Sequence, residues 1–463
     1  MDLSQMIKIT FMRMIKIITE VLLIVLITSN FSLFAQKPLT LKECIKYSLT
    51  NNSNIKIANY DVDISKKKIS EQFGNYLPQI NVSGSLDDYL KLVTQLIPAE
   101  ILGGAPGTFI PITFGNKYNV TGAAQLTQKL YDPTSIYGIQ SAKINKEIFS
   151  QTLQKTSEQT VFKISLVYYQ TLVIQMQMNV LKSTLTASEQ SLKSTELKFK
   201  NGMAKKIDVD KIRVSFNNTK SQLEQAKLSY SQSLNTLKYN MGMPVDSSMA
   251  LADTTLNISK YLLANDTVHK LQMENIIDYQ LGKTNISLMQ INKKTYSAAY
   301  LPSLSFYGNY NFNAMRQEFN FFDRNKDWYP SSGIGLKLTI PIFDGLQRNS
   351  RVAQSELNIK IAKENLLLTE QSIKVDISNY EIQYKNALDN INREKENLDL
   401  AESVYKNTQL EYQQGAGSTL DLIQSESSYT MAQNTYFNKL LDLYIARIEL
   451  EKAKGTLMKF INN

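Results

Sequence analysis

The stretch KFKNGMAKKIDVD, from Lys198 to Asp210, interrupts a long run of residues that otherwise has an unbroken helical pattern. Its Asn-Gly pair is typical of a helix C-terminus, because glycine adopts the left-handed backbone of a helix cap without a steric cost. The helical pattern resumes directly after the break. A second stretch, EYQQGAGSTLDLI from Glu411 to Ile423, has the same arrangement, and its Gly415 lies 213 residues after Gly202. The sequence therefore predicts two helical hairpins with equivalent turns.

Other segments recur at a similar spacing. YLPQINVSGS (Tyr76–Ser85) returns as YLPSLSFYGN (Tyr300–Asn309), and QLTQKLYD (Gln125–Asp132) returns as KLTIPIFD (Lys337–Asp344). Recurrence of this kind indicates an internal duplication, here with the order helix, two strands, long helix, helix in each copy. The expected domains are a signal peptide at 1–35, a first structural repeat at 36–250 and a second at 251–463.

Each repeat contains one very long helix. Asp132 and Pro133 predict the start of the first, since aspartate is a good N-cap and proline is tolerated at the first helical position. Asp344 is the equivalent cap in the second repeat. No proline lies between these starts and the glycines of the two breaks. Each long helix should therefore have about 68 residues and a length of roughly 100 Å.

Shorter helices complete each repeat. The first opens with the capping box TLKE at Thr40 and should end near Gly74, because Pro78 cannot continue it. Another short helix is expected at about 208–241. Its apolar and small residues step alternately by four and three positions, as in a heptad seam. These residues are Ile212, Phe216, Thr219, Leu223, Ala226, Tyr230, Ser233 and Leu237.

Two segments in each repeat alternate apolar and polar residues with the period of a β-strand. Their apolar faces are Ile80 to Leu86, Val120 to Leu130, Leu304 to Phe312 and Ile334 to Ile342, at every second position. Strands of about 9–12 residues are long enough to cross a bilayer when tilted. A membrane leaves no strand edge unpaired, so four strands need further copies of the chain: a dimer supplies eight strands and a trimer twelve.

The N-terminal segment has the pattern of a secretory signal peptide, with basic residues, an apolar stretch at Val21–Ile27 and the small residue Ala35. We expect cleavage after Ala35, and the alternative is an uncleaved anchor. Met12 or Met14 is an alternative start of translation.

Composition argues against catalysis, metal binding and nucleic-acid binding. The chain has one cysteine, Cys44, and one histidine, His269, so serine–histidine catalysis and histidine or zinc clusters lack their residues. The net charge of +9 comes from scattered lysines, with one short run at Lys66–Lys68. We therefore expect no enzyme activity, no cofactor, no catalytic or metal site and no nucleic-acid partner.

The segment LTLKECIKYSLTNN, the paired YLP helix ends, the IPIFDG strand end and the two glycine breaks resemble the TolC-like outer-membrane efflux proteins, over essentially the whole mature chain. The resemblance implies a mostly α fold with a small β part. Tandem-duplicated long helical hairpins would form an α-barrel, and four transmembrane strands per chain would form a trimeric 12-stranded β-barrel.

The resemblance also implies a function and partners. The chain would be a homotrimeric exit duct in outer-membrane lipid of a Gram-negative bacterium, with a periplasmic extension. Together with a periplasmic adaptor protein and an inner-membrane pump, it would passively export drugs, small molecules or proteins in tripartite efflux or type I secretion. The alternative is a secreted or surface coiled-coil scaffold without a pore.

Two groups of residues acquire roles from the resemblance. The helix tips would contact the adaptor through Phe199, Gly202, Ala204, Tyr412, Gly415, Ser418 and Thr419. Asp421, and less so Asp208, would form the periplasmic gate, although Gln424 stands where the family has a second gate aspartate. The structural alternatives are helix caps for the glycines and favourable helix-dipole positions for the aspartates. The apolar loop Leu86–Lys117 would be extracellular, either as a lid over the mouth or as a loop without a role.

Overall fold

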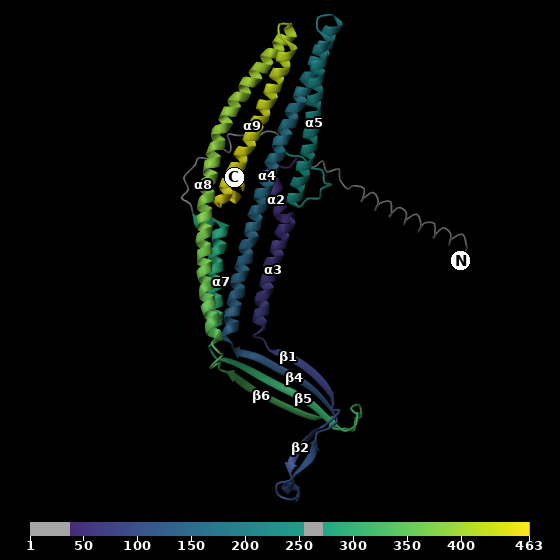
Figure 1. Cartoon of the computed structure of the whole chain (residues 1–463), viewed down its shortest axis with the longest axis vertical. Helices are drawn as coiled ribbons and strands as arrows, with labels where there is room; N and C mark the ends of the chain where they lie inside the picture. The colour runs from purple at the N-terminus through teal and green to yellow at the C-terminus, as the bar shows by residue number, and fades with distance from the viewer. Residues whose placement is uncertain (1–37, 254–271, 463) are drawn as a thin grey trace, which may run out of the picture. The chain divides into compact units, whose positions relative to one another are not determined.

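The computed structural model describes residues 38–253 and 272–462 (Figure 1). The expected signal peptide at 1–35 and His269 lie outside the described residues. Among the helices that are described, none combines the length and the apolarity needed to cross a membrane. The elements are α2 (Leu41–Asn51), α3 (Ser53–Gly74), β1 (Gln79–Asp88), β2 (Val93–Pro98), η1 (Ala99–Leu102), β3 (Phe109–Phe114), β4 (Tyr118–Tyr131), α4 (Pro133–Lys200), α5 (Lys206–Met241), η2 (Met273–Asn275), α7 (Ile277–Ala298), β5 (Ser303–Arg316), β6 (Tyr329–Thr339), α8 (Gln347–Gln414), α9 (Thr419–Ala453) and α10 (Leu457–Asn462).

The capping box predicted at Thr40 is present. The amide of Glu43 donates to Thr40 Oγ1 at 3.3 Å, and the amide of Thr40 donates to Glu43 Oε2 at 2.8 Å. The prediction of one continuous helix from Thr40 to Gly74 is wrong, because α2 ends and α3 begins on either side of Asn52. The Asn52 side chain accepts from the amides of Asn54 and Ile55, so it acts as the N-cap of α3.

The two long helices have the predicted length, since α4 and α8 have 68 residues each. Asp132 caps α4 as expected, and its Oδ1 accepts from the amide of Thr134 at 3.1 Å. The start predicted for α8 directly after Asp344, at Gly345, is wrong by two residues. Gly345 and Leu346 have φ values of 63° and 67°, so the chain makes a left-handed turn before the helix begins at Gln347.

The chain forms two compact units, and each takes segments from both halves of the sequence. Among the described residues, the first unit comprises 38–51, 163–253 and 387–445. It is helical and contains α2, α5 and parts of α4, α8 and α9. The heptad seam predicted on α5 faces its interior: Ile212, Leu223 and Leu237 are at most 5% exposed. A tight cluster of Ile212, Tyr405, Tyr412 and Leu422 forms one part of this core.

Among the described residues, the second unit comprises 52–162, 272–386 and 446–462, and it contains the four predicted strands. They form one antiparallel sheet in the order β1-β4-β5-β6 (Figure 1). The strands have 10, 14, 14 and 11 residues, close to the predicted lengths. Ile276, Ile373 and Ile377 form a small apolar core among the helices of this unit.

The segment Leu86–Lys117, expected as a loop, contains a further pair of strands. Within this segment β2 and β3 pair as an antiparallel hairpin, with Leu96 opposite Pro111 and Val93 opposite Phe114. The short η1 turn connects them, and Gly103 ends it with a φ of 82°. The hairpin exposes large apolar side chains, with Val93 70% and Leu96 62% exposed.

Candidate functional site

One face of the four-stranded sheet is apolar across its whole width. Ile80 lies opposite Leu126, which lies opposite Gly308, which lies opposite Ile334. Residues directly opposite one another in an antiparallel sheet project to the same face. The rows on either side are mostly apolar, with Val82, Ala124, Tyr310 and Ser332 in one and Gln128, Phe306 and Leu336 in the other.

This apolar face is exposed. Val82 and Ile334, on the two outer strands, are 80% and 81% exposed. A water-soluble monomer rarely leaves so broad an apolar surface uncovered, so the face requires an apolar environment. Its alternation and strand length are those of a strand that crosses a bilayer.

The opposite face of the sheet is polar. Its members from the four strands include Asn81, Ser83, Gln125, Thr127, Asn309, Asn311, Ser331 and Lys337. Lys129 and Lys337 both lie opposite Ser305, so their charges are on this face. A sheet with one apolar and one polar face suits a wall between lipid and water.

The sheet has two unpaired edges in the described part of the chain, the outer sides of β1 and β6. Successive strands alternate in direction, so β1 and β6 run in opposite directions. The β1 strand of a second copy could therefore continue the antiparallel pattern next to β6. Bilayer interiors leave no backbone hydrogen-bonding group without a partner, so these edges must be paired.

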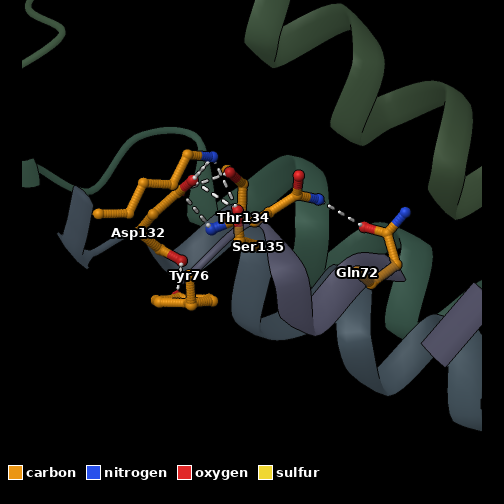
Figure 2. Close-up of polar contacts among 7 residues, drawn as sticks. Gln72, Tyr76, Asp132, Thr134 and Ser135 are labelled. Atoms are coloured by element: carbon orange, nitrogen blue, oxygen red, sulfur yellow. Dashed lines mark hydrogen bonds and ion pairs between the residues drawn. The ribbon is translucent and has the colours of Figure 1, made fainter. Parts of the chain in front are cut away.

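A polar cluster fixes the point where the sheet joins the helices (Figure 2). The Asp132 carboxylate accepts from Thr134 Oγ1, Ser135 Oγ and Lys129 Nζ at 2.6–2.7 Å, and its backbone carbonyl accepts from Tyr76 Oη at 2.6 Å. Burial alone would raise the pKa of the Asp132 carboxyl, but these hydrogen bonds and the Lys129 charge lower it well below its usual value. The cluster ties the end of α3 to the start of α4.

The two predicted helix turns have equivalent backbone geometry. Gly202 has a φ of 76° and donates to the carbonyl of Phe199, whereas Gly415 has a φ of 81° and donates to the carbonyl of Tyr412. An added Cβ would meet no atom within 4 Å at either glycine. The left-handed backbone, and not a lack of space, therefore explains why glycine is needed. The helix-cap interpretation of both glycines is confirmed.

The side chains at the two turns are not equivalent. Phe199 is 43% exposed, but Tyr412, at the equivalent position, is only 6% exposed. The Tyr412 hydroxyl lies 2.6 Å from Thr195 Oγ1, and Lys198 Nζ donates to the Tyr412 carbonyl at 2.9 Å. Tyr412 thus joins the tips of α4 and α8 from the inside, and it presents little surface to a partner.

The other residues predicted to contact the adaptor also differ in exposure. Gly202, Gly415 and Ser418 are exposed, Ala204 is half-buried, and Thr419 is 8% exposed. Sequence reasoning missed Thr195 and Lys198, which hold Tyr412. Their spacing of three residues near the end of α4 places them on one helix face, which was the available signal.

Both predicted gate aspartates accept a hydrogen bond from the residue that precedes their helix, as the third helical residue does in a capping box. Ser418 Oγ donates to Asp421 Oδ2 at 2.6 Å and accepts from the Asp421 amide at 3.1 Å. Asp208 Oδ2 accepts from the amide of Lys205 at 3.3 Å. Asp421 is exposed and Asp208 is half-buried, so Asp421 has the more available carboxylate.

A further acidic residue, missed by sequence reasoning, lies between α5 and α9. Glu426 is only 8% exposed and lines a groove of about 800 Å³ between these helices. Burial raises the pKa of its carboxyl to about 6, although a hydrogen bond from Ser215 Oγ at 3.4 Å partly offsets this. The signal was its position four residues after Leu422, on the buried stripe of α9.

The sequence matches the family model described as "Outer membrane efflux protein" over residues 44–243 and 285–456. One relative is outer membrane protein TolC from Vibrio cholerae serotype O1. It is 20% identical over 350 residues, which are 73% of this chain and 77% of that protein.

Solved structures have the same fold at low sequence identity. A structure of CusC has a TM-score of 0.70 at 16% identity and covers 92% of this chain and 95% of its own. The open state of the MtrE outer membrane channel from Neisseria gonorrhoeae has a TM-score of 0.67 at 16% identity, with 90% and 89% covered. The CmeC outer membrane channel from Campylobacter jejuni has a TM-score of 0.69 at 16% identity, with 90% and 86% covered.

Proposed function

Because this chain belongs to the outer membrane efflux protein family and is an efflux channel of the outer membrane, we propose that three copies form the exit duct of a tripartite assembly. The family consists of transport proteins and not of enzymes, and we propose that this channel catalyses no reaction. The observation that carries the proposal is the sheet, which has an exposed apolar face, a polar face and two edges that no described strand pairs with.

Three copies would join their sheets edge to edge into a closed wall of twelve strands. The apolar faces would contact lipid and the polar faces would line the pore. Two copies would give a closed wall of eight strands, but the interior of an eight-stranded barrel is largely filled by side chains. Twelve strands leave room for solutes to pass.

We propose that the turns at Gly202 and Gly415 contact a periplasmic adaptor, which links the channel to an inner-membrane pump. The exposed residues Phe199, Gly202, Gly415 and Ser418 are the surface for this contact. Ala204, Tyr412 and Thr419 contribute by holding the shape of the tips. The exposed glycines support the proposal, since a residue without a side chain leaves the backbone of the turn open to contact.

The gate is proposed at Asp421, with Asp208 in a lesser role. Three copies would place three Asp421 carboxylates around one axis, and like charges close together attract cations. The capping bond with Ser418 fixes the side chain of Asp421 in one orientation. The division of the mature chain into repeats at 36–250 and 251–463 accounts for the equivalent geometry of the two turns.

Engineered disulfides between copies test the three-copy arrangement. In a chain with Cys44→Ala, one cysteine replaces Asn81, Ser83 or Ser85 in β1 and a second replaces Ser331 in β6. At least one pair should give covalent trimers after mild oxidation, and chains with a single cysteine should give none. Covalent dimers as the largest product, or no cross-link with any pair, would contradict the proposal.

A further inference from the structure

The groove between α5 and α9 has the dimensions of a small-molecule site. Its volume of about 800 Å³ falls within the range of roughly 300–1,000 Å³ found for ligand pockets. Three charged residues line it, Asp210, Lys211 and Glu426, and the other lining residues are uncharged polar or apolar. The groove lies entirely within the first unit.

Glu426 is the most deeply buried charged group of the groove. Its Oε2 accepts the hydrogen bond from Ser215, whereas its Oε1 is buried and has no hydrogen-bond partner among residues 38–253 and 272–462. None of the ion pairs in these ranges includes Glu426. A buried carboxylate oxygen without a partner is costly, because it has lost its hydration and gained nothing in exchange. A ligand with a positively charged donor would supply the missing interaction.

Apolar side chains line the same groove. Val214 from α5 is 59% exposed, and Leu420 and Met431 from α9 are 61% and 68% exposed. These side chains offer contact area beside the carboxylate. The groove therefore combines a buried, negatively charged hydrogen-bond acceptor with an apolar wall.

Among the described residues, the groups around Glu426 leave its charge uncompensated. Tyr405 faces it from α8, and burial followed by the Glu426 charge raises the pKa of this phenol to about 12, so it remains neutral. Asp210 and Lys211 from α5 carry opposite charges and offset each other. The net charge of the groove at neutral pH is that of Glu426.

We propose that this groove binds a small organic cation, a protonated amine on an apolar body. The ammonium group donates a charge-assisted hydrogen bond to Glu426 Oε1, and the body packs against Val214, Leu420 and Met431. The inference does not depend on the number of copies or on the adaptor, since every residue involved belongs to one chain.

The proposal predicts how binding depends on pH. Because burial raises the pKa of the Glu426 carboxyl to about 6, the group is ionised at pH 7.5 and mostly protonated at pH 5. A protonated carboxyl cannot pair with an ammonium group. At one pH unit below its pKa about a tenth of the carboxyl is ionised, so the affinity should fall about tenfold.

Calorimetric titration of the full chain in an uncharged detergent tests the proposal, with benzylammonium chloride as the probe and benzyl alcohol as its neutral counterpart. The amine should bind at pH 7.5, more weakly at pH 5, and the alcohol should not bind at either pH. Glu426→Gln keeps the shape of the side chain and should weaken amine binding at least tenfold. Glu411→Gln, an exposed position outside the groove, is the matched control and should bind like the wild type.

Several results would overturn the proposal. These are equal binding of amine and alcohol, unchanged affinity in Glu426→Gln, or no binding of the amine at millimolar concentration. Loss of the assembled state in Glu426→Gln, together with no binding to the wild type, would show that a neighbouring copy occupies the groove. If Glu426→Gln fails to fold, the pH series on the wild type alone decides, since an affinity that does not fall at pH 5 excludes the carboxylate.

Discussion

Arginine substitutions on the two faces of β1 test whether the sheet crosses the membrane as described. Val82 and Ser83 are neighbours near the middle of β1, but Val82 belongs to the apolar face and Ser83 to the polar face. An arginine on the lipid-facing side of a strand costs about 2–4 kcal/mol near the bilayer centre. Val82→Arg should therefore cost about 6–12 kcal/mol for a channel of three copies. Ser83→Arg should cost far less, because its side chain meets water.

Recovery of assembled protein measures this difference. Outer membranes are isolated from cells that produce each variant, and the assembled form is quantified on gels without boiling. The wild type and Ser83→Arg should appear as assembled channel at similar levels, whereas Val82→Arg should be strongly depleted. Equal recovery of the two variants, or depletion of Ser83→Arg alone, would refute the assignment of the two faces.

Three further predictions concern individual side chains. Tyr412→Phe removes the buried hydrogen bond to Thr195 and should lower the free energy of unfolding by about 1 kcal/mol, measured by urea denaturation; no change would mean that the bond does not hold the tips together. Asp421→Ala should weaken the block of channel conductance by divalent cations more than Asp208→Ala does, and an unchanged block would remove Asp421 from the gate. Asp132→Asn should lower the thermal unfolding midpoint at pH 7. Since the pKa of the Asp132 carboxyl is lowered from 3.8 by its hydrogen bonds, its stabilisation is present above that pH and is lost as the pH falls through the depressed pKa. The difference between this variant and the wild type should therefore shrink below about pH 4, and a constant difference would show that ionisation is not the cause.

Local sequence signals were sufficient to predict the long helices and the strands. Asp132 and Gly202 mark the two ends of α4 through backbone chemistry that depends on adjacent residues only. The alternation of Ile80, Val82 and Leu86 fixes which face of β1 is apolar, since side chains at every second position of a strand lie on the same face. Such features follow from positions close together in the chain.

The prediction of an unbroken helix from Thr40 to Gly74 was wrong because contacts between distant parts of the chain compete with the local pattern. Asn52 lies in the polar run NNSN, which also suits a continuous helix, but α2 packs against α5 and α3 begins separately at the Asn52 cap. Leu39 forms a bridge with Leu251, which fixes the chain just before α2. No pattern within residues 40–74 reports these contacts, so the break in the helix could not be predicted.

The same reason explains why the candidate site was only partly predicted. The turns at Gly202 and Gly415 follow from local signals, but Tyr412 and Phe199 differ in burial because Thr195 and Lys198 approach one of them only. Glu426 lines a groove only because α5 lies opposite α9. Sequence equivalence predicts equivalent backbone, and packing decides which side chain is available to a ligand.

Current recordings across a planar lipid bilayer test the central claim, that copies of this chain form an open path through the outer membrane. The purified protein should produce discrete conductance steps of one size, and addition of divalent cations to the side that carries the helical turns should reduce them. The variant Val82→Arg at equal protein concentration is the matched control and should insert rarely. A wild-type protein that reaches the bilayer and produces no conductance steps would contradict the account.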